Sequence, residues 1–570
     1  MSEESAADET KTLGAPRMIE LRRPRLLPRG LGVVIALAFT VVAGCHDKSA
    51  PALQSVTITP AQPAVTLGTT QQLTVMGMYS DGSSQNVTST AAFVSETPAV
   101  ATVSNSGLVT GVAAGTAVVD ATVSGVKGSA TVTVTVSNVA VIHASPDAPN
   151  VNVIVDGKTA VTDLEFGQGT APVTLATGAH TFAVQAQLPG GSLATVIPST
   201  GTSVSETLDA NTQYIIIAEG TVANIGAQIF SRPLATIPSG QVRVQVFHAA
   251  PAAPPVDVYV TAPGAGVAGA TPLGTFAFHG TLGPVTVAAG SYEIYVTLAG
   301  TKTVVFDSGE TPLAAGADLL IAAQQNTGPG SSPITLSVTT AAGVNARLLD
   351  IATPATVRVV HASPDAPAVS VYANESLTTP LVDCLKFPGY TGSQASSCPT
   401  YTAYLPVFPA ASVTSVQVTP YGNNGVIAID APVTLAAGTN YSVYAVGALA
   451  SIMPLVLTDD TRRIATEAKL RLIHASPSAG KVDIYLTAAS SLAGQTPVLS
   501  NVAFKTDSGF LPVAAGTYYV TVTPTGTSTP AIGPAAVTLA ASGIYTAVAV
   551  DHVGGGAPLG LITLDDFNLP

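Results

Sequence analysis

The sequence predicts an all-β protein, built as a tandem array of about five β-sandwich domains behind a cleaved signal peptide. Three observations lead to this prediction. The chain has 570 residues, too many for one core at ~100–200 residues per domain. Only 10% of its residues are charged, whereas it holds 52 Gly and 42 Pro, a composition poor in strong helix formers. From residue 55 onward, short runs alternate apolar and polar residues with the period of half-buried strands.

The first 45 residues carry an export signal. Arg22, Arg23, Arg25 and Arg29 precede an uncharged run over 30–44, which is too short to span a bilayer comfortably and ends at Cys45. The tetrapeptide VAGC at 42–45 resembles the lipobox of bacterial lipoproteins. That resemblance implies cleavage before Cys45 and acylation of its thiol. Residues 1–44 are then a signal peptide, with Met18 as an alternative start, and 45–54 a lipidated tether. An ordinary signal peptide and a signal-anchor helix are the alternatives.

Charge restricts the partners of the mature chain. Removing residues 1–44 takes away six of 21 basic and five of 34 acidic residues, which leaves 15 basic, 29 acidic and a net charge of −14. Nucleic acid and anionic headgroups reward clustered Lys and Arg, so neither is expected as a partner. The expected membrane contact is the lipid on Cys45. His46 stands where some lipoproteins carry the Asp that retains them at the inner membrane, so the outer membrane or cell surface is favoured.

Residues 55–137 form the first predicted domain. The stretch PAVATVSNSGLVTGVAAGTAVV at 98–119 closely resembles the bacterial Ig-like group 2 domain, which implies an immunoglobulin-type sandwich. The chain departs from that family at Phe93, where a core Trp is usual. We expect Phe93 to fill the same space less completely.

The rest of the chain repeats one pattern four times, starting with an apolar strand that ends in His-Ala and a Pro-rich turn. The motif, for example VRVVHASPDAPAVSVY at 357–372, resembles the DUF4397 family, a bacterial β-sandwich domain of unknown function. A late Leu-x5-Tyr element resembles a tyrosine corner in three copies, whereas the second copy has Leu319 in the Tyr position. The predicted repeats, numbered 1 to 4, are 138–232, 241–343, 356–458 and 469–570, with linkers at 231–240, 345–355 and 459–468, where the alternation lapses.

The recurring histidines are the obvious candidates for chemistry. Their neighbours change between copies: Asp147 becomes Ala252 in the second and Ser478 in the fourth. A catalytic or metal-binding His needs partners that persist, so we interpret all four as structural residues of the turn. They are His143, His248, His361 and His474.

Other candidate sites also have structural explanations. Asp257 and Asp483 alternate with Val, which predicts solvent-facing positions and not a carboxylate pair for glycoside hydrolysis. Residues 264–269 match GxGxxG, but the residues that follow cannot begin the helix a dinucleotide needs. We therefore expect no catalytic residues, no metal, no cofactor and no nucleotide. Cys384 and Cys398 flank an insertion in the third repeat, and export favours a disulfide between them; free thiols or a metal pair are the alternatives.

Two classes of function remain. In the first, a lipid-anchored envelope protein presents its domains for surface binding or adhesion to a glycan, wall polymer or protein. In the second, the domains are non-binding spacers joined end to end, or an envelope scaffold. An unrecognised polysaccharide-active enzyme is a remote third, and we expect no enzyme.

Overall fold

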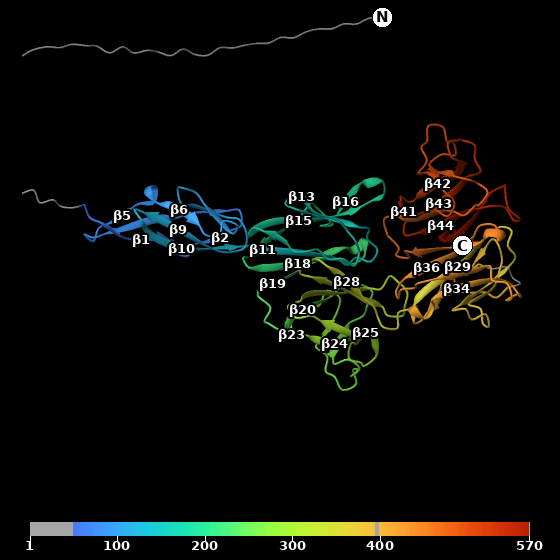
Figure 1. Ribbon diagram of the computed structural model, residues 1–570, viewed down its shortest axis with the longest axis horizontal. Coiled ribbons are helices and arrows are strands. Elements are labelled where there is room, and N and C mark those ends of the chain that lie inside the picture. The colour runs from blue at the N-terminus through green and yellow to red at the C-terminus, as the bar shows by residue number, and fades with distance from the viewer. Residues whose placement is uncertain (1–49, 394–397, 569–570) are drawn as a thin grey trace, which may run out of the picture. The chain divides into compact units, whose positions relative to one another are not determined.

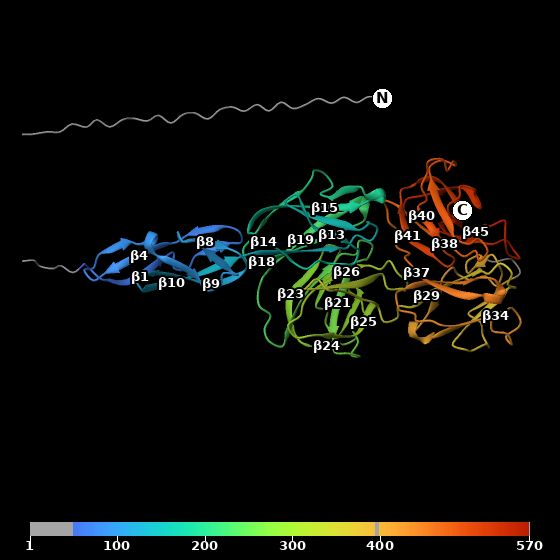
Figure 2. The same ribbon diagram turned by 45° about the horizontal axis from the view of Figure 1, so that its top comes forward.

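The computed structural model describes residues 50–393 and 398–568, and the residues from Leu53 on form one compact unit (Figures 1 and 2). Strands are the dominant regular structure of these residues, which confirms the predicted all-β class. The helices are single 3-10 turns at η1 (Thr88–Thr90), η2 (Pro189–Gly191), η3 (Val222–Asn224), η4 (Ala410–Ser412), η5 (Leu449–Ser451) and η6 (Asp566–Asn568).

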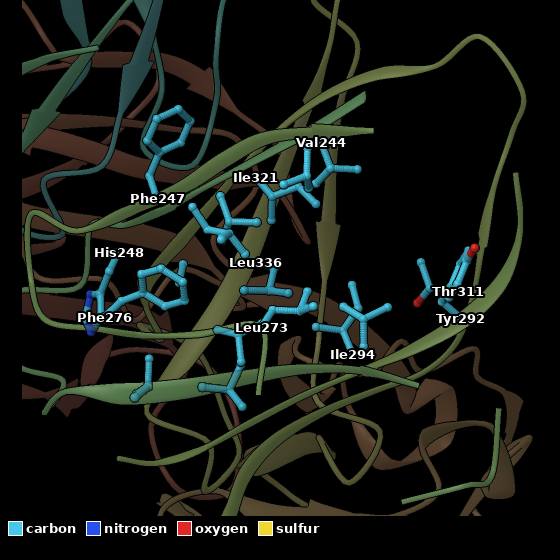
Figure 3. Close-up of a pocket in the computed structure, with 18 of the residues that line it drawn as sticks. Val244, Phe247, His248, Leu273, Phe276, Tyr292, Ile294, Thr311, Ile321 and Leu336 are labelled. Atoms are coloured by element: carbon cyan, nitrogen blue, oxygen red, sulfur yellow. The ribbon is translucent and has the colours of Figure 1, made fainter. Parts of the chain in front are cut away.

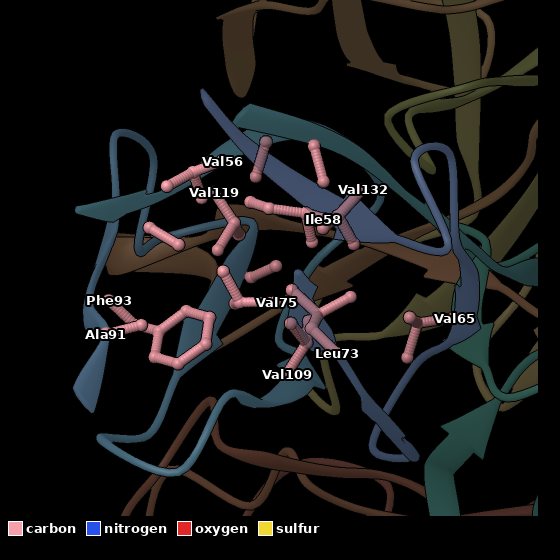
Figure 4. Close-up of a cluster of buried hydrophobic side chains, with 14 of the residues drawn as sticks. Val56, Ile58, Val65, Leu73, Val75, Ala91, Phe93, Val109, Val119 and Val132 are labelled. Atoms are coloured by element: carbon pink, nitrogen blue, oxygen red, sulfur yellow. The ribbon is translucent and has the colours of Figure 1, made fainter. Parts of the chain in front are cut away.

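The first domain is a sandwich of small sheets, ordered β1-β4-β5, β2-β10-β9-β6 and β3-β8-β7. Phe93 is buried in its core, as Figure 4 shows, and its ring tip lies where a Cβ on Gly107 would come within 2.7 Å. The strands are β1 (Leu53–Thr59), β2 (Ala64–Thr66), β3 (Thr70–Gln72), β4 (Thr74–Tyr79), β5 (Ser84–Asn86), β6 (Ala92–Ser95), β7 (Ala101–Val103), β8 (Leu108–Gly111), β9 (Gly115–Val123) and β10 (Val126–Thr135).

Repeats 1 and 2 are two further sandwiches. The strands of repeat 1 are β11 (Ser137–His143), β12 (Val151–Val155), β13 (Lys158–Leu164), β14 (Val173–Leu175), β15 (Gly178–Gln187), β16 (Leu193–Ile197), β17 (Val204–Leu208), β18 (Thr212–Glu219) and β19 (Gly226–Pro233). Those of repeat 2 are β20 (Gln241–His248), β21 (Val256–Thr261), β22 (Gly274–Phe276), β23 (Thr281–Ala288), β24 (Gly290–Leu298), β25 (Val304–Leu313), β26 (Asp318–Gln325), β27 (Ile334–Thr340) and β28 (Asn345–Leu348).

Repeats 3 and 4 have the same plan. The strands of repeat 3 are β29 (Ala355–Ala362), β30 (Val369–Ala373), β31 (Val382–Leu385), β32 (Gly389–Tyr390), β33 (Leu405–Val407), β34 (Ser415–Pro420), β35 (Ile429–Pro432), β36 (Asn440–Val446) and β37 (Met453–Asp459). Those of repeat 4 are β38 (Ala468–His474), β39 (Val482–Thr487), β40 (Leu499–Val502), β41 (Asp507–Val513), β42 (Gly516–Pro524), β43 (Ile532–Leu539), β44 (Ile544–Val550) and β45 (Gly560–Asp565).

Each repeat consists of two sheets. We call one the pairing sheet: β14-β11-β18-β19, β23-β20-β26-β27-β28, β32-β29-β36-β37 and β41-β38-β44-β45. The other is the outer sheet: β13-β12-β15-β16, β22-β21-β24-β25, β31-β30-β34-β35 and β40-β39-β42-β43. The first strand of every repeat lies in the pairing sheet and runs parallel to the late strand that carries the Tyr or Leu position.

The pairing sheets are buried on both faces. In β11, Val139 and Val141 point into the core of repeat 1, whereas Ala140 and Ile142 join a second cluster with Phe247 and neighbours from repeat 2. Repeats 3 and 4 share a matching cluster that includes Val360, Tyr444, Ile473 and Val548. Removing a second sheet face from water adds stability at ~25 cal/mol per Å² of apolar surface. The repeats therefore pack in pairs, face to face, and the end-to-end joining assumed in the spacer interpretation is wrong.

Buried ion pairs accompany both packed faces. Between repeats 1 and 2, Asp318 of β26 accepts from Arg243 Nη2 at 2.5 Å and from Arg232 Nη2 at 3.0 Å. Between repeats 3 and 4, Asp459 at the end of β37 contacts Arg471 Nη1 at 2.6 Å and Arg358 Nη2 at 3.4 Å. In each case an arginine of one repeat and a carboxylate of its neighbour lose water together, so each charge needs the other.

The second linker is shorter than the sequence predicts. Residues 345–355 were expected to lie outside the sheets, but β28 (Asn345–Leu348) pairs antiparallel with β27. Asn345 also reaches repeat 1, where its side chain exchanges hydrogen bonds of 2.8 Å with the N–H and C=O of Gly169. The polar residues here belong to an edge strand of the pairing sheet. Asn345 on this strand bonds to the neighbouring repeat.

Candidate functional site

The four histidines occupy one recurring turn at the end of the first strand. In repeat 1, His143 Nε2 donates to the carbonyl of Pro149 at 3.0 Å, and Nδ1 accepts from the N–H of Ser145 at 3.4 Å. His248, His361 and His474 make the same two contacts, to residues two and six positions later. With both ring nitrogens occupied, none of the four offers a free nitrogen for a metal or a substrate.

Burial in these turns disfavours the charged form of three of the histidines, His143, His248 and His361. Each ring is almost fully buried and lies edge to face against a Phe, which is Phe166 in repeat 1. Burial lowers the pKa of His143 to about 4, against the smaller opposing effect of its hydrogen bond to Pro149. Burial also lowers the pKa of His248 and of His361. The neutral imidazole is what the turn requires, because Nδ1 must accept.

Asp257 and Asp483 do not face solvent, contrary to the prediction from alternation. They are 4% and 7% exposed. Asp483 accepts from the backbone N–H of Asn501 at 2.7 Å and of Gly526 at 2.9 Å, and these bonds lower its pKa. Asp257 accepts from Thr275 and from the N–H of Gly300. Each carboxylate joins a neighbouring strand, β22 or β40, to a turn at Gly300 or Gly526, which is a structural role other than the one expected.

Tyrosine corners are present in the three repeats that carry the Tyr. The hydroxyl accepts the N–H five residues upstream: Asp209 to Tyr214 at 3.0 Å, Ala436 to Tyr441 at 3.1 Å and Ala540 to Tyr545 at 2.9 Å. Leu319 in repeat 2 has no hydroxyl and cannot make this bond.

Cys384 and Cys398 form a disulfide, with their Cα atoms 5.4 Å apart. Tyr390, which lies between them, packs half-buried against the cluster shared by repeats 3 and 4. Its ring therefore belongs to the contact between repeats and is not a free recognition surface.

The GxGxxG segment is a loop and no helix follows it. Gly264 and Gly266 have φ of 75° and 64°, a region that favours glycine. The N–H of Gly264 donates to Glu293 Oε2 at 2.5 Å, and Val267 packs on Tyr259 and Tyr295. The loop is folded against the outer face of the outer sheet of repeat 2, so it does not serve as a phosphate cradle.

Repeat 2 holds an apolar cavity of about 260 Å³ between its two sheets. Figure 3 shows Val244, Ile321 and Leu336 of the pairing sheet on one side, and Ile294 of the outer sheet with Leu273, just before β22, on the other. The corresponding interior space in repeat 3 is about 10 Å³. An unfilled space of the larger size costs on the order of 6 kcal/mol at ~24 cal/mol per Å³.

Two side chains distinguish this core from that of repeat 1. The strand registers Val155–Phe182 and Val260–Ile294 are equivalent, since Val155 and Val260 each lie 12 residues after the turn histidine. Ile294 thus stands where repeat 1 has the buried Phe182. By the same alignment, Leu319 stands where repeat 1 has Tyr214. Two aromatic rings are replaced by smaller aliphatic side chains.

Leu319 is the exception among the four late strands in the sequence, but its side chain does not line the cavity. It was interpreted only as a missing corner. The loss of Phe182 at Ile294 needed the strand register and could not be found from spacing.

Several predictions lie outside or beyond the described residues. Cys45 and its lipid lie outside them. Within 50–393 and 398–568, no group of three His, Cys, Asp or Glu side chains is placed to hold a metal ion. No helix in that part of the chain is long and apolar enough to cross a bilayer.

Comparison with known families gives one match for the first domain and three for the rest of the chain. The bacterial Ig-like domain (group 2) model matches residues 52–134. The model of DUF4397, a domain of unknown function, matches 137–259, 355–485 and 487–570, more than half of the chain. The chain belongs to the DUF4397 family. Both resemblances predicted from the sequence are confirmed.

Single proteins add less to this DUF4397 assignment. Ice-binding protein 1 of Shewanella frigidimarina is 36% identical over 115 residues, which is 18% of this chain and 13% of that protein. The solved Bacillus anthracis TIE protein aligns with 81% of this chain and 74% of its own at 11% identity. Eight Ig domains of Down Syndrome Cell Adhesion Molecule align with 87% of this chain and 60% of their own at 9% identity. Both structural alignments have a TM-score of 0.12, so neither supports an argument.

The domain content is that of an extracellular or surface protein with a binding or scaffold role, and no catalytic family is among its matches.

Proposed function

We propose that this DUF4397 chain is a lipid-anchored cell-envelope protein that presents its β-sandwich domains for surface binding or adhesion. The observation that carries the proposal is that the turn after the first strand is the same in all four repeats, whereas other loops differ between them. All four repeats keep the turn histidine and its two hydrogen bonds. Other loops differ between the repeats: repeat 2 carries the glycine loop, and repeat 3 carries the disulfide-closed insertion. Loops on a rigid scaffold are where recognition is usually placed.

The class of partner is an extracellular polymer or protein, in line with the mature net charge of −14. The short match to an ice-binding protein supports including ice among the candidate surfaces. Glycan, wall polymer and protein ligands remain the main candidates. Nucleic acid does not fit the charge of the chain.

The test of binding uses the mature chain without its leader and lipid, residues 46–570, against ice, glycans, wall polymers and host proteins. The fragment 46–137 serves as the control for the first domain alone. We expect saturable binding by the mature chain that the fragment lacks. No binding across the panel would overturn the proposal.

The anchor has a test of its own. Globomycin inhibits the peptidase that cuts lipoprotein signals, so we expect the unprocessed chain to accumulate in its presence. Normal removal of the leader in treated cells would contradict acylation of Cys45 while leaving surface binding open.

A scaffold is the second candidate, and the paired repeats favour it. The exposed aromatic side chains among the described residues, Phe408 at 58% and Tyr421 at 53%, lie apart. Phe408 follows the strand that pairs with the start of β29, whereas Tyr421 bonds to Ala368 beyond its end. Sugar-binding surfaces usually gather such rings, so their separation argues for interlocked domains that hold other envelope components in place.

A further inference from the structure

The cavity of repeat 2 is enclosed by hydrocarbon. Its lining side chains are almost all Val, Leu, Ile, Phe and Ala. The polar atoms among them are already used: Tyr292 donates to Ala288 O at 2.9 Å, Thr311 bonds to Ser308 at 3.2 Å, and His248 completes its turn. A buried water needs two to four polar partners, so a space of this kind stays dry or takes an apolar guest.

The cavity is longer than a single ring. Its lining covers Val244 to His248 on β20, Val256 to Val260 on β21 and Tyr292 to Val296 on β24. Five residues of strand extend about 13 Å at ~3.3 Å per residue. Figure 3 shows His248 and Phe276 at one end and Tyr292 and Thr311 at the other. Its volume of about 260 Å³ also exceeds the roughly 150 Å³ that holds benzene in an engineered core.

The lining residues beside the edge strands β22 and β23 are the ones most open to solvent. The strand β22 has three residues and pairs with β21 only from Val256 to Val258, whereas β13 of repeat 1 runs along all of β12. The chain that would extend β22 is instead the glycine loop folded on the outer face. Among the lining residues beside the gap between these strands, Leu273 is 51% exposed.

We propose that repeat 2 binds an unbranched hydrocarbon chain, inserted between its two sheets through the gap between β22 and β23. The inference rests on the binding role proposed above and names one class of ligand for it. The chain can come from a free fatty acid or from the acyl tail of a lipid, and in either case the polar end stays at this gap. Each methylene removed from water favours the bound state by ~0.8 kcal/mol.

The test is calorimetric titration of the mature chain, residues 46–570, with decanoic acid, didecanoylphosphatidylcholine below its micellar concentration, and toluene. The decisive variant is Ile294→Phe, which places in repeat 2 the ring that repeat 1 carries at Phe182. Its matched control is Val304→Phe, at a residue that is 41% exposed on β25 and does not line the cavity. Val260→Leu, the residue of repeat 4 at Leu486, adds one carbon at the cavity wall.

We expect decanoic acid to bind the parent chain and Val304→Phe equally, to bind Ile294→Phe at least tenfold more weakly, and to lose about fourfold in Val260→Leu. Binding of the phosphatidylcholine but not of the acid would identify lipid as the source. Binding of toluene alone, no binding at all, or decanoic acid affinity unchanged in both cavity variants would overturn the proposal. A polymer or protein ligand that Ile294→Phe still binds would leave the surface function standing without it.

Discussion

At the scale of single residues, the protonation of His143 is coupled to the folding of the chain. His143 has a pKa of about 4 in the folded chain and an ordinary value near 6.5 when unfolded. Below pH 6.5 the unfolded chain therefore binds a proton that the folded turn refuses. Its contribution to stability is complete above pH 6.5, falls between pH 6.5 and 4, and changes little below that.

We predict that the free energy of unfolding falls by on the order of 3 kcal/mol across this window because of His143. Urea titrations at several pH values between 4 and 7.5 measure it. The variant His143→Asn removes the titrating ring, so it should be less stable at pH 7.5 and have a shallower pH dependence. An unchanged slope would show that the ring is not refused its proton.

The corner hydroxyls provide a second prediction. Tyr545→Phe removes the hydroxyl that accepts the N–H of Ala540, which should destabilise repeat 4 by about 0.5–1.5 kcal/mol. Thermal unfolding checks this. Tyr421→Phe removes a hydroxyl from a ring that is 53% exposed and should change stability by less than ~0.5 kcal/mol. Equal effects of the two substitutions would mean that the corner bond contributes nothing.

Sequence reasoning predicted the histidine and tyrosine positions well because their spacing is fixed within each copy. It failed for Asp257 and Asp483, which alternate with Val yet are buried. Alternation assumes that one face of the strand meets water. Here a turn beside each strand donates an N–H to the carboxylate and shields it from water.

At the scale of strands, the pairing sheets explain why some sequence runs do not alternate between apolar and polar residues. Runs such as YIIIAE at 214–219 and VRVV at 357–360 are nearly continuous in buried residues. Such runs are typical of strands covered on both faces. The sequence therefore held the information that these sheets pack on something, but not that the neighbour is the next repeat, because that depends on the arrangement of whole domains.

Buried charge at the end of β37 leads to a third prediction. Burial disfavours the charge of Arg358, but the carboxylates of Asp565 and Asp459 outweigh burial and raise its pKa. Asp459→Asn keeps the shape and removes one of these charges, and Arg471 then also loses its partner at 2.6 Å. Breaking a buried pair on one side costs about 3–5 kcal/mol.

At the scale of the molecule, that loss should reach two repeats at once, because repeats 3 and 4 share one apolar cluster. Hydrogen–deuterium exchange of the Asp459→Asn chain should accelerate in both of them and stay unchanged in repeats 1 and 2. Glu96→Gln in the first domain is the control, since Glu96 and its partner Lys127 are both 53% exposed and their pair is worth ~1 kcal/mol or less. Acceleration confined to repeat 3 would contradict a shared unit.

The face-to-face packing also determines how many repeats such a chain can gain or lose at a time. Gain or loss of a single repeat leaves one pairing sheet with a bare apolar face, which includes Ile215 and Ile217 or their counterparts. A naked face of that kind invites association with another chain. Gain or loss of a packed pair of repeats leaves no pairing sheet uncovered. In the four-repeat part of the molecule, the unit that can be gained or lost is therefore the pair and not the single domain.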